Sequence, residues 1–220
     1  MLGDSRSRIR RQAVSIGLAL APFGLAFGVA CQRAGLQWWE AAGFSALVFT
    51  GSAQFAAVGV LADGGSAAAA IAAGTLLNIR SLAFGLILAP YLSGPRWWRA
   101  LVSHGMIDES TAVALSQDDP VLRRYGYLVG ASSVFTSWNT ATLVGFLAVG
   151  SSGSTITKWG LDATIPAAFL ALLWPRLDSP GRRRTAAAGI LIAALLVPFS
   201  PPGVPIIAAS CGVFASGRNP

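Results

Sequence analysis

The sequence predicts an all-α membrane protein, a polytopic bundle of about seven or eight transmembrane helices in which some helices can be interrupted. The mean hydropathy is +0.60, 54% of the residues are hydrophobic and only 11% are charged, whereas soluble domains average about 25% charged residues. Apolar segments of membrane-spanning length recur along all 220 residues, so no stretch remains for a soluble domain of ordinary size. We therefore expect one integral membrane domain over residues 1–220, with a basic cytoplasmic segment over residues 1–12.

Turns rich in glycine, serine and proline separate the apolar segments, and the pairs Trp38-Trp39 and Trp97-Trp98 indicate headgroup depth. The first segment is longer than the apolar core of a signal peptide, so we expect it to be retained as a helix. The last two are short and bounded by proline, and one hairpin that does not fully cross is an alternative for them. The expected spans cover residues 13–31, 41–61, 67–92, 100–116, 126–149, 161–177, 185–199 and 203–216.

Arginine and lysine set the expected orientation, because cytoplasmic loops carry an excess of both. With eight crossings and a cytoplasmic N-terminus, four basic residues fall outside, namely Arg33, Arg96, Arg99 and Lys158. Eleven fall inside, namely Arg6, Arg8, Arg10, Arg11, Arg123, Arg124, Arg176, Arg182, Arg183, Arg184 and Arg218. Both termini are therefore expected in the cytoplasm. These residues form short clusters between apolar segments, as at an anionic membrane face, so nucleic acid is not an expected partner.

Asn78 and Arg80 lie in the middle of the third expected span. An arginine at the centre of a spanning helix costs about 2.5–3.5 kcal/mol on insertion scales, so its charge must face protein, water or a ligand. Two interpretations stay open. Arg80 either forms a structural ion pair between two helices, or lines a pathway and meets an anion or a carboxylate.

A second polar interruption, Thr50-Gly51-Ser52-Ala53-Gln54, lies inside the second expected span. A helix broken there exposes backbone N–H and carbonyl groups to a cavity, which is a recurring way to bind a zwitterion. A glycine-lined packing surface is the alternative. Asn139 belongs to a further polar cluster over residues 132–139 of the fifth span.

The segment 100–116 is the least lipid-like and carries His104, Asp108 and Glu109. Adjacent residues lie about 100° apart on a helix, so the two carboxylates cannot face one partner, whereas His104 and Asp108 share a face. One carboxylate is thus free to pair with Arg80 and the other to exchange protons, because apolar surroundings disfavour its charged form. An interfacial helix with a solvated acidic end is the alternative. Asp162, at an expected helix end, is a further candidate for coupling.

Close helix packing is expected at two glycine pairs, Gly24 with Gly28 and Gly126 with Gly130, because this spacing lets two backbones approach. Enzyme chemistry is not expected. With one histidine the chain has no zinc-protease motif, it has no P-loop, and an intramembrane serine protease would have only His104 as its base. Cys31 and Cys211 are interpreted as small hydrophobic residues. We expect no metal and no cofactor.

Several blocks resemble the AzlC family, in the order of that family and over nearly the whole chain. They read PFGLAFG over residues 22–28, FTGSAQF over 49–55, NIR over 78–80, LAP over 88–90, DE over 108–109, GLD over 160–162 and IPAAF over 165–169. The resemblance implies a multi-pass permease of the bacterial inner membrane for branched-chain amino acids, commonly an exporter. It also implies a small hydrophobic partner of the AzlD type. One departure is Ser81, where the family often has a histidine after the arginine.

We therefore expect a secondary transporter for branched-chain or other neutral apolar amino acids, acting as an exporter coupled to the proton gradient. Its expected substrate-binding residues are Gly51, Ser52, Gln54, Asn78, Arg80 and Asn139, and its expected coupling or ion-pair residues are His104, Asp108, Glu109 and Asp162. Two alternatives stay open: a non-transporting membrane subunit that scaffolds a partner, and an anion channel built on Arg80.

Overall fold

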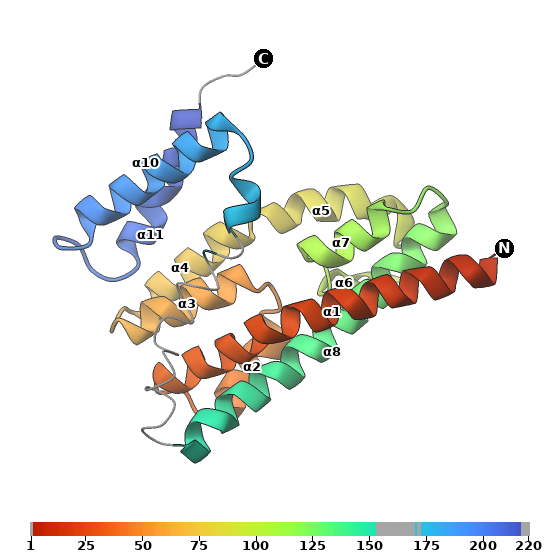
Figure 1. The fold of residues 1–220 in the computed structure, drawn as a ribbon, viewed down its shortest axis with the longest axis horizontal. Coiled ribbons are helices and arrows are strands. Elements are labelled where there is room, and N and C mark those ends of the chain that lie inside the picture. Colours follow the sequence, from red (N-terminus) through yellow and green to blue (C-terminus); the bar gives the residue numbers. More distant parts are fainter. Residues whose placement is uncertain (1, 153–169, 171–172, 217–220) are drawn as a thin grey trace.

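The computed structural model describes residues 2–152, 170 and 173–216, and every regular element in these ranges is a helix (Figure 1). The all-α prediction is confirmed for this part of the chain. Most of the expected span 161–177, including Asp162, lies outside the described residues. In chain order the elements are α1 (Leu2–Arg33), α2 (Trp38–Leu47), α3 (Ser52–Ala62), α4 (Ala67–Asn78), α5 (Arg80–Leu88), η1 (Ala89–Tyr91), α6 (Arg96–Ser103), α7 (Asp108–Leu115), α8 (Pro120–Ser152), η5 (Trp174–Arg176), α10 (Pro180–Leu196), α11 (Val204–Ala209) and η6 (Ser210–Ser216).

The two longest helices, α1 and α8, run side by side in the same direction (Figure 1). Near their starts, the guanidinium of Arg6 lies 5.3 Å from the centre of the Tyr125 ring. Further along, the hydroxyl of Ser137 donates a hydrogen bond to the carbonyl oxygen of Gly17 at 2.6 Å. Contacts therefore advance together along both helices, as parallel packing requires. We call the end where α1 and α8 begin the arginine-rich end, and the other the far end.

Glycines allow this close approach. A Cβ atom on Gly28 would lie 2.0 Å from the carbonyl oxygen of Thr142, and one on Gly145 would lie 2.1 Å from that of Leu25. Both distances are far below van der Waals contact, so neither position accepts a larger residue unless the helices separate. Gly24 also packs against α8, where a Cβ atom would lie 3.0 Å from the carbonyl oxygen of Trp138, and Gly126 and Gly130 pack against α7. The close packing predicted at both glycine pairs is confirmed.

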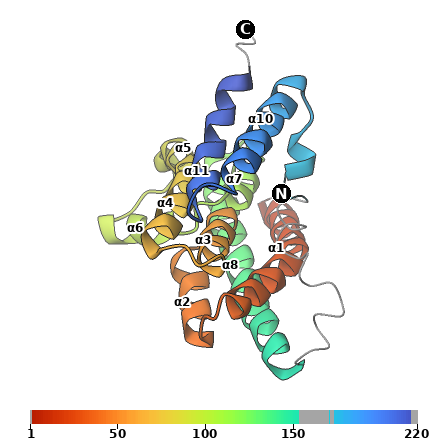
Figure 2. The same ribbon diagram turned by 90° about the vertical axis from the view of Figure 1, so that its left-hand side faces the viewer.

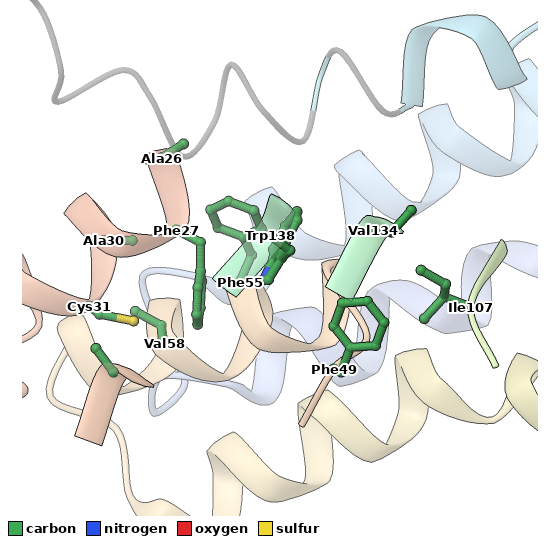
Figure 3. Packing of buried hydrophobic residues seen from close by; sticks show 11 residues of the cluster. Ala26, Phe27, Ala30, Cys31, Phe49, Phe55, Val58, Ile107, Val134 and Trp138 are labelled. Atoms are coloured by element: carbon green, nitrogen blue, oxygen red, sulfur yellow. The ribbon is translucent and has the colours of Figure 1, made fainter. Parts of the chain in front are cut away.

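The helices α2 and α3 form a hairpin that enters from the far end and turns back. Going along α2, Ser45 hydrogen-bonds Thr142 at 3.2 Å and the following Phe49 contacts Phe135 at 5.1 Å between ring centres, so α2 runs against the direction of α8. The chain reverses at Gly51, whose φ of +57° favours glycine. Figure 3 then shows Val58 of α3 beside Cys31, near the end of α1. Both ends of this hairpin thus lie toward the far end.

The helices α6 and α7 form a second hairpin, which enters from the arginine-rich end. Along α6 and the turn that follows, Val102 accepts a hydrogen bond from the Tyr127 hydroxyl and Gly105 packs against Ala131, so this arm advances with α8. Along α7 the order reverses, since Ser110 lies against Gly130 and Val113 against Gly126. The chain therefore runs inward along α6 and returns along α7 to the arginine-rich end.

These hairpins correct the expectation that residues 41–61 and 100–116 each run through the bundle in one direction. The expectation rested on apolar length alone, which is the same for one long helix and for two short helices folded back on each other. By length and composition, one described helix, Gly3–Arg33, is able to cross a bilayer, and α4 with α5 makes a second if this pair, bent by 42°, counts as one span. The predicted number of crossings is not confirmed.

The reversal at each hairpin also changes where the arginines lie. Arg96 and Arg99 lie in the first turn of α6. The start of α6 lies beside the start of α8, because Ser93, just before α6, accepts a hydrogen bond from Arg124 of α8. Arg96 and Arg99 therefore join the arginine-rich end, although the count of eight crossings placed them on the opposite face. Arg33 is the one arginine of residues 2–152 that lies toward the far end. The arginine-rich end then carries Arg6, Arg8, Arg10, Arg11, Arg96, Arg99, Arg123 and Arg124.

The last helices form a separate layer. Gly189 of α10 packs against Ala209, and Gly212 packs against Thr185, so α10 runs antiparallel to α11 and η6. Figures 1 and 2 show this pair displaced from α1 and α8, and the start of α11 contacts α4. The hairpin alternative for residues 185–199 and 203–216 agrees with this antiparallel packing.

Candidate functional site

The tips of the two hairpins meet midway along α1 and α8. The imidazole Nε2 of His104 lies 2.6 Å from the carbonyl oxygen of Ala46, and its ring centre lies 6.2 Å from that of Phe49. Beside the tips is a cavity of about 300 Å³. It is lined by Leu20, Phe23, Phe49, Thr50, Gly51, Ser52, Leu77, Arg80, Ile107, Asp108, Glu109, Val134, Trp138, Leu173 and Arg176.

A network of charged side chains forms one wall of the cavity. Arg80 Nη1 donates to Asp108 Oδ2 at 2.6 Å, and Arg80 Nη2 donates to the Ser52 hydroxyl at 3.0 Å. Arg176 Nη2 reaches the same Asp108 oxygen at 2.7 Å. These four residues come from α5, α3, α7 and η5, so the network ties together both hairpins, the bent helix and a distant segment.

Local structure places the two charges at the ends of helices. Arg80 begins α5, directly after the bend between α4 and α5, so its side chain leaves the helix where the backbone is already interrupted. Asp108 and Glu109 occupy the first turn of α7, where the N-terminal end of the helix dipole stabilises negative charge. The bend between α4 and α5 and the acidic first turn of α7 therefore both lie at the cavity.

Of the alternatives left open for the acidic pair, the structure selects pairing with Arg80. Asp108 is 20% exposed and holds two arginines, so it is not a solvated helix end. Glu109 also lines the cavity, but it makes no ion pair among the described residues. Of the two adjacent carboxylates, Asp108 thus pairs with arginine and Glu109 does not within the described ranges.

The remaining walls are apolar. Figure 3 shows Val134, Ile107 and Phe49 at one side of the buried cluster and Trp138 beside Phe27 and Phe55. Trp138 is 5% exposed, and its indole N–H has no hydrogen-bond partner within the described part of the chain. Phe23, Leu20, Leu77 and Leu173 complete this surface. A ligand in the cavity would thus meet charge on one side and hydrocarbon on the other.

Gln54, a predicted substrate-binding residue, lies inside the first hairpin. Its side chain is fully buried, and its Nε2 donates to the carbonyl oxygens of Phe44 and Ser45, both at 3.2 Å. Its Oε1 accepts from the backbone N–H of Gly51 at 3.1 Å. All these bonds lie within the first hairpin, because the turn leaves these backbone groups without helical partners. Gln54 therefore holds the turn and does not line the cavity.

Three further predicted residues also lie outside the cavity wall. Asn78 accepts a hydrogen bond from Ser81 and faces a different groove, between α4 and the first hairpin. Asn139 donates to the carbonyl oxygen of Phe135 on its own helix. His104 contacts Ala46 at the hairpin tips. In contrast, five predicted site residues line the cavity, namely Gly51, Ser52, Arg80, Asp108 and Glu109.

Arg176 is the site residue that sequence reasoning placed elsewhere. Its position after Trp174-Pro175 resembles an ordinary basic loop, and it was counted with the cytoplasmic arginines. The structure instead brings it to Asp108. The residues around Arg176 do not show whether it lies in a basic loop or at the cavity. Its contact with Asp108 depends on how η5 packs against a helix 68 residues earlier in the sequence.

A model of the AzlC protein family matches residues 15–151 of the chain. The chain belongs to the AzlC family. Its relatives include an uncharacterized membrane protein of Archaeoglobus fulgidus, 29% identical over 208 residues, with 92% of this chain and 90% of the relative covered. Another, from Helicobacter pylori strain 26695, is 25% identical over 182 residues, covering 82% and 79%. The inner membrane protein YgaZ of Escherichia coli K12 is 26% identical over 171 residues, covering 74% and 69%. No solved structure matches.

AzlC membership makes this chain a membrane protein of a family tied to branched-chain amino acid transport. The AzlC match covers both hairpins and every residue that lines the cavity except Leu173 and Arg176. The cavity is thus built mainly by the part of the chain that defines the family.

Proposed function

We propose that this AzlC protein is a permease for neutral amino acids with apolar side chains, branched-chain amino acids among them, and that it acts as an exporter. The observation that carries the proposal is the cavity itself. It joins Arg80, Asp108, Glu109 and Arg176 to walls of Phe, Leu, Ile, Val and Trp side chains. A branched-chain amino acid has the matching parts, two opposite charges on one carbon and a compact hydrocarbon group.

Size and position support the same ligand. A volume of about 300 Å³ is at the small end of ligand pockets, which span about 300–1,000 Å³. The helices α3 and α7 both begin at the cavity, with Ser52 and Asp108. Interrupted helices that expose their N-terminal N–H groups near the bundle centre are a recurring way for transporters to bind a carboxylate.

The hairpins suggest how access alternates. They enter from opposite ends and meet beside the cavity, so a small movement of one tip against the other would open the cavity toward one side at a time. Among residues 2–152, eight arginines lie at the arginine-rich end and Arg33 lies toward the far end, which favours a cytoplasmic location for the arginine-rich end and thus for the N-terminus.

Three further features belong to the proposal. We expect location in the bacterial inner membrane, a small hydrophobic partner subunit of the AzlD type, and coupling to the proton gradient. Among the carboxylates of the cavity, Asp108 binds two guanidinium groups. Glu109 is therefore our candidate for the residue that exchanges the proton.

Flux in proteoliposomes tests the proposal. Purified protein is reconstituted with and without the AzlD-type subunit, and the flux of labelled leucine and valine is measured against concentration. We expect saturable flux of both, stimulated by a proton gradient. Chloride flux that does not saturate would instead identify an anion channel. No leucine or valine flux in either preparation would contradict the permease and favour a scaffold subunit.

A further inference from the structure

We propose that the cavity selects ligands carrying one positive and one negative charge, with Arg176 binding the ligand carboxylate and Glu109 its ammonium group. This inference rests on the proposed function and assigns the two ends of its substrate.

Among the described residues, four charged side chains line the cavity, and their formal charges cancel: two arginines, Arg80 and Arg176, against two carboxylates, Asp108 and Glu109. A charge brought into apolar surroundings is costly unless an opposite charge compensates it. A ligand with a net charge would therefore leave one charge of the cavity or of the ligand uncompensated. A zwitterion leaves none, so the charge balance itself favours amino acids over simple carboxylates or amines.

Arg80 and Asp108 form the fixed part of this set. Arg80 uses Nη1 for Asp108 and Nη2 for Ser52, so both ends of its guanidinium are engaged. Its side chain is 36% exposed and that of Asp108 is 20% exposed. Moving either side chain would break contacts between α3, α5 and α7. These two residues therefore hold the hairpins together. We expect their ion pair to stay intact when a ligand binds.

Among the described residues, Arg176 makes fewer polar contacts than Arg80. Within the described part of the chain it has one ion-pair contact, to an Asp108 oxygen that Arg80 already occupies, and its side chain is 60% exposed. Asp108 would keep its bond to Arg80 if Arg176 turned away. The planar guanidinium has two parallel N–H groups that match a carboxylate, which makes such an exchange favourable. Arg176 is thus the arginine that can bind a ligand without opening the hairpin contacts.

Glu109 supplies the opposite charge. It lines the cavity one residue after Asp108, and within the described residues it forms no ion pair. An ammonium group would give this carboxylate an oppositely charged partner. The spacing is also suitable, since Arg176 contacts the residue that precedes Glu109. A proton and a ligand ammonium group would then bind alternately to the Glu109 carboxylate, which provides a physical basis for coupling transport to the proton gradient.

Binding of three related compounds tests the assignment: leucine, 4-methylpentanoate, which lacks the ammonium group, and 3-methylbutylamine, which lacks the carboxylate. Affinities are measured by calorimetry on the purified protein together with its partner subunit. Wild type should bind leucine at least about tenfold more tightly than either analogue, since a hydrogen bond to a charged group contributes a factor of this order. Phenylalanine is included as a second zwitterion.

Two variants should shift this preference in opposite directions. Glu109→Gln should weaken leucine binding about tenfold or more and favour 4-methylpentanoate relative to 3-methylbutylamine, whereas Arg176→Gln should weaken leucine similarly and favour the amine. Matched controls are Arg182→Gln, an exposed arginine of α10, and Asp118→Asn, an exposed acid between α7 and α8. Both should bind all compounds as wild type does. Melting temperatures check that all four variants fold.

The outcomes separate this inference from the proposed function. If leucine binds but both site variants weaken all compounds by the same factor, the assignment is overturned while the permease stands. If phenylalanine binds and leucine does not, with the opposite shifts preserved, the branched-chain substrate is wrong and the assignment stands. If 4-methylpentanoate binds wild type as tightly as any zwitterion, or no zwitterion binds, the assignment is overturned.

Discussion

Asp108→Asn should reduce leucine flux by about 100-fold or more and destabilise the protein by about 1–3 kcal/mol, the cost of removing the acceptor of two charged donors at a partly buried site. The asparagine keeps the shape of the side chain but removes the negative charge that Arg80 and Arg176 share at 2.6 and 2.7 Å. Two arginines would then face each other without a common partner, and the cavity would carry a net positive charge. Flux and thermal denaturation in detergent measure the two effects.

Asp178→Asn is the matched control. Asp178 also pairs with an arginine, Arg182, but both side chains are about 60% exposed and four residues apart on the surface. Such pairs contribute about 0.3–0.5 kcal/mol, so this variant should behave as wild type. Wild-type flux and stability in Asp108→Asn would show that the charge network is not part of the site. An equal loss in both variants would indicate a general sensitivity to removing acids.

Gly28→Ala should lower the melting temperature by about 5–10 °C, given that overpacking costs about 1–3 kcal/mol and that each kcal/mol shifts a chain of this size by about 2–4 °C. The added Cβ would lie 2.0 Å from the Thr142 carbonyl oxygen and 2.7 Å from the Phe146 nitrogen. Both atoms belong to the backbone of α8, so no side-chain rotation relieves the clash. The helices α1 and α8 must separate, which also disturbs the cavity walls contributed by both.

Gly59→Ala provides the control for this prediction. Gly59 also lies within a helix, α3, but a Cβ there would have no neighbour within 4 Å. Alanine should be neutral or slightly stabilising at Gly59, because glycine is the poorer helix former. The packing of α1 on α8 would be refuted if both variants melted at the wild-type temperature.

The parts of this account that sequence could predict depend on residue chemistry. The membrane class follows from composition, the close helix approach from Gly24 and Gly28, and the pairing of Arg80 with an acid from the cost of leaving an arginine uncompensated in an apolar segment. The division between Asp108 and Glu109 also follows, because adjacent helical residues point in different directions. In each case a local rule determines the outcome.

The parts that sequence could not predict depend on the path of the chain. Residues 41–61 and 100–116 are apolar enough for a straight helix or for a hairpin, and only the turn at Gly51 hints at reversal. Gln54 and Asn139 are polar residues in apolar segments, which suits a ligand site as well as the backbone contacts that they make. Arg176 reaches the cavity through packing that no nearby residue encodes.

The central claim is that substrate binds in the cavity where the hairpins meet, and protection of a cysteine there tests it most directly. In a Cys211→Ser background, with Cys31 buried, Thr50→Cys places a thiol in the cavity and Thr75→Cys places one in the groove beside α4. We predict that leucine slows maleimide labelling at position 50, half-maximally at the concentration that half-saturates flux, and leaves position 75 unaffected. Labelling at position 50 that does not change while leucine flux saturates would contradict the account.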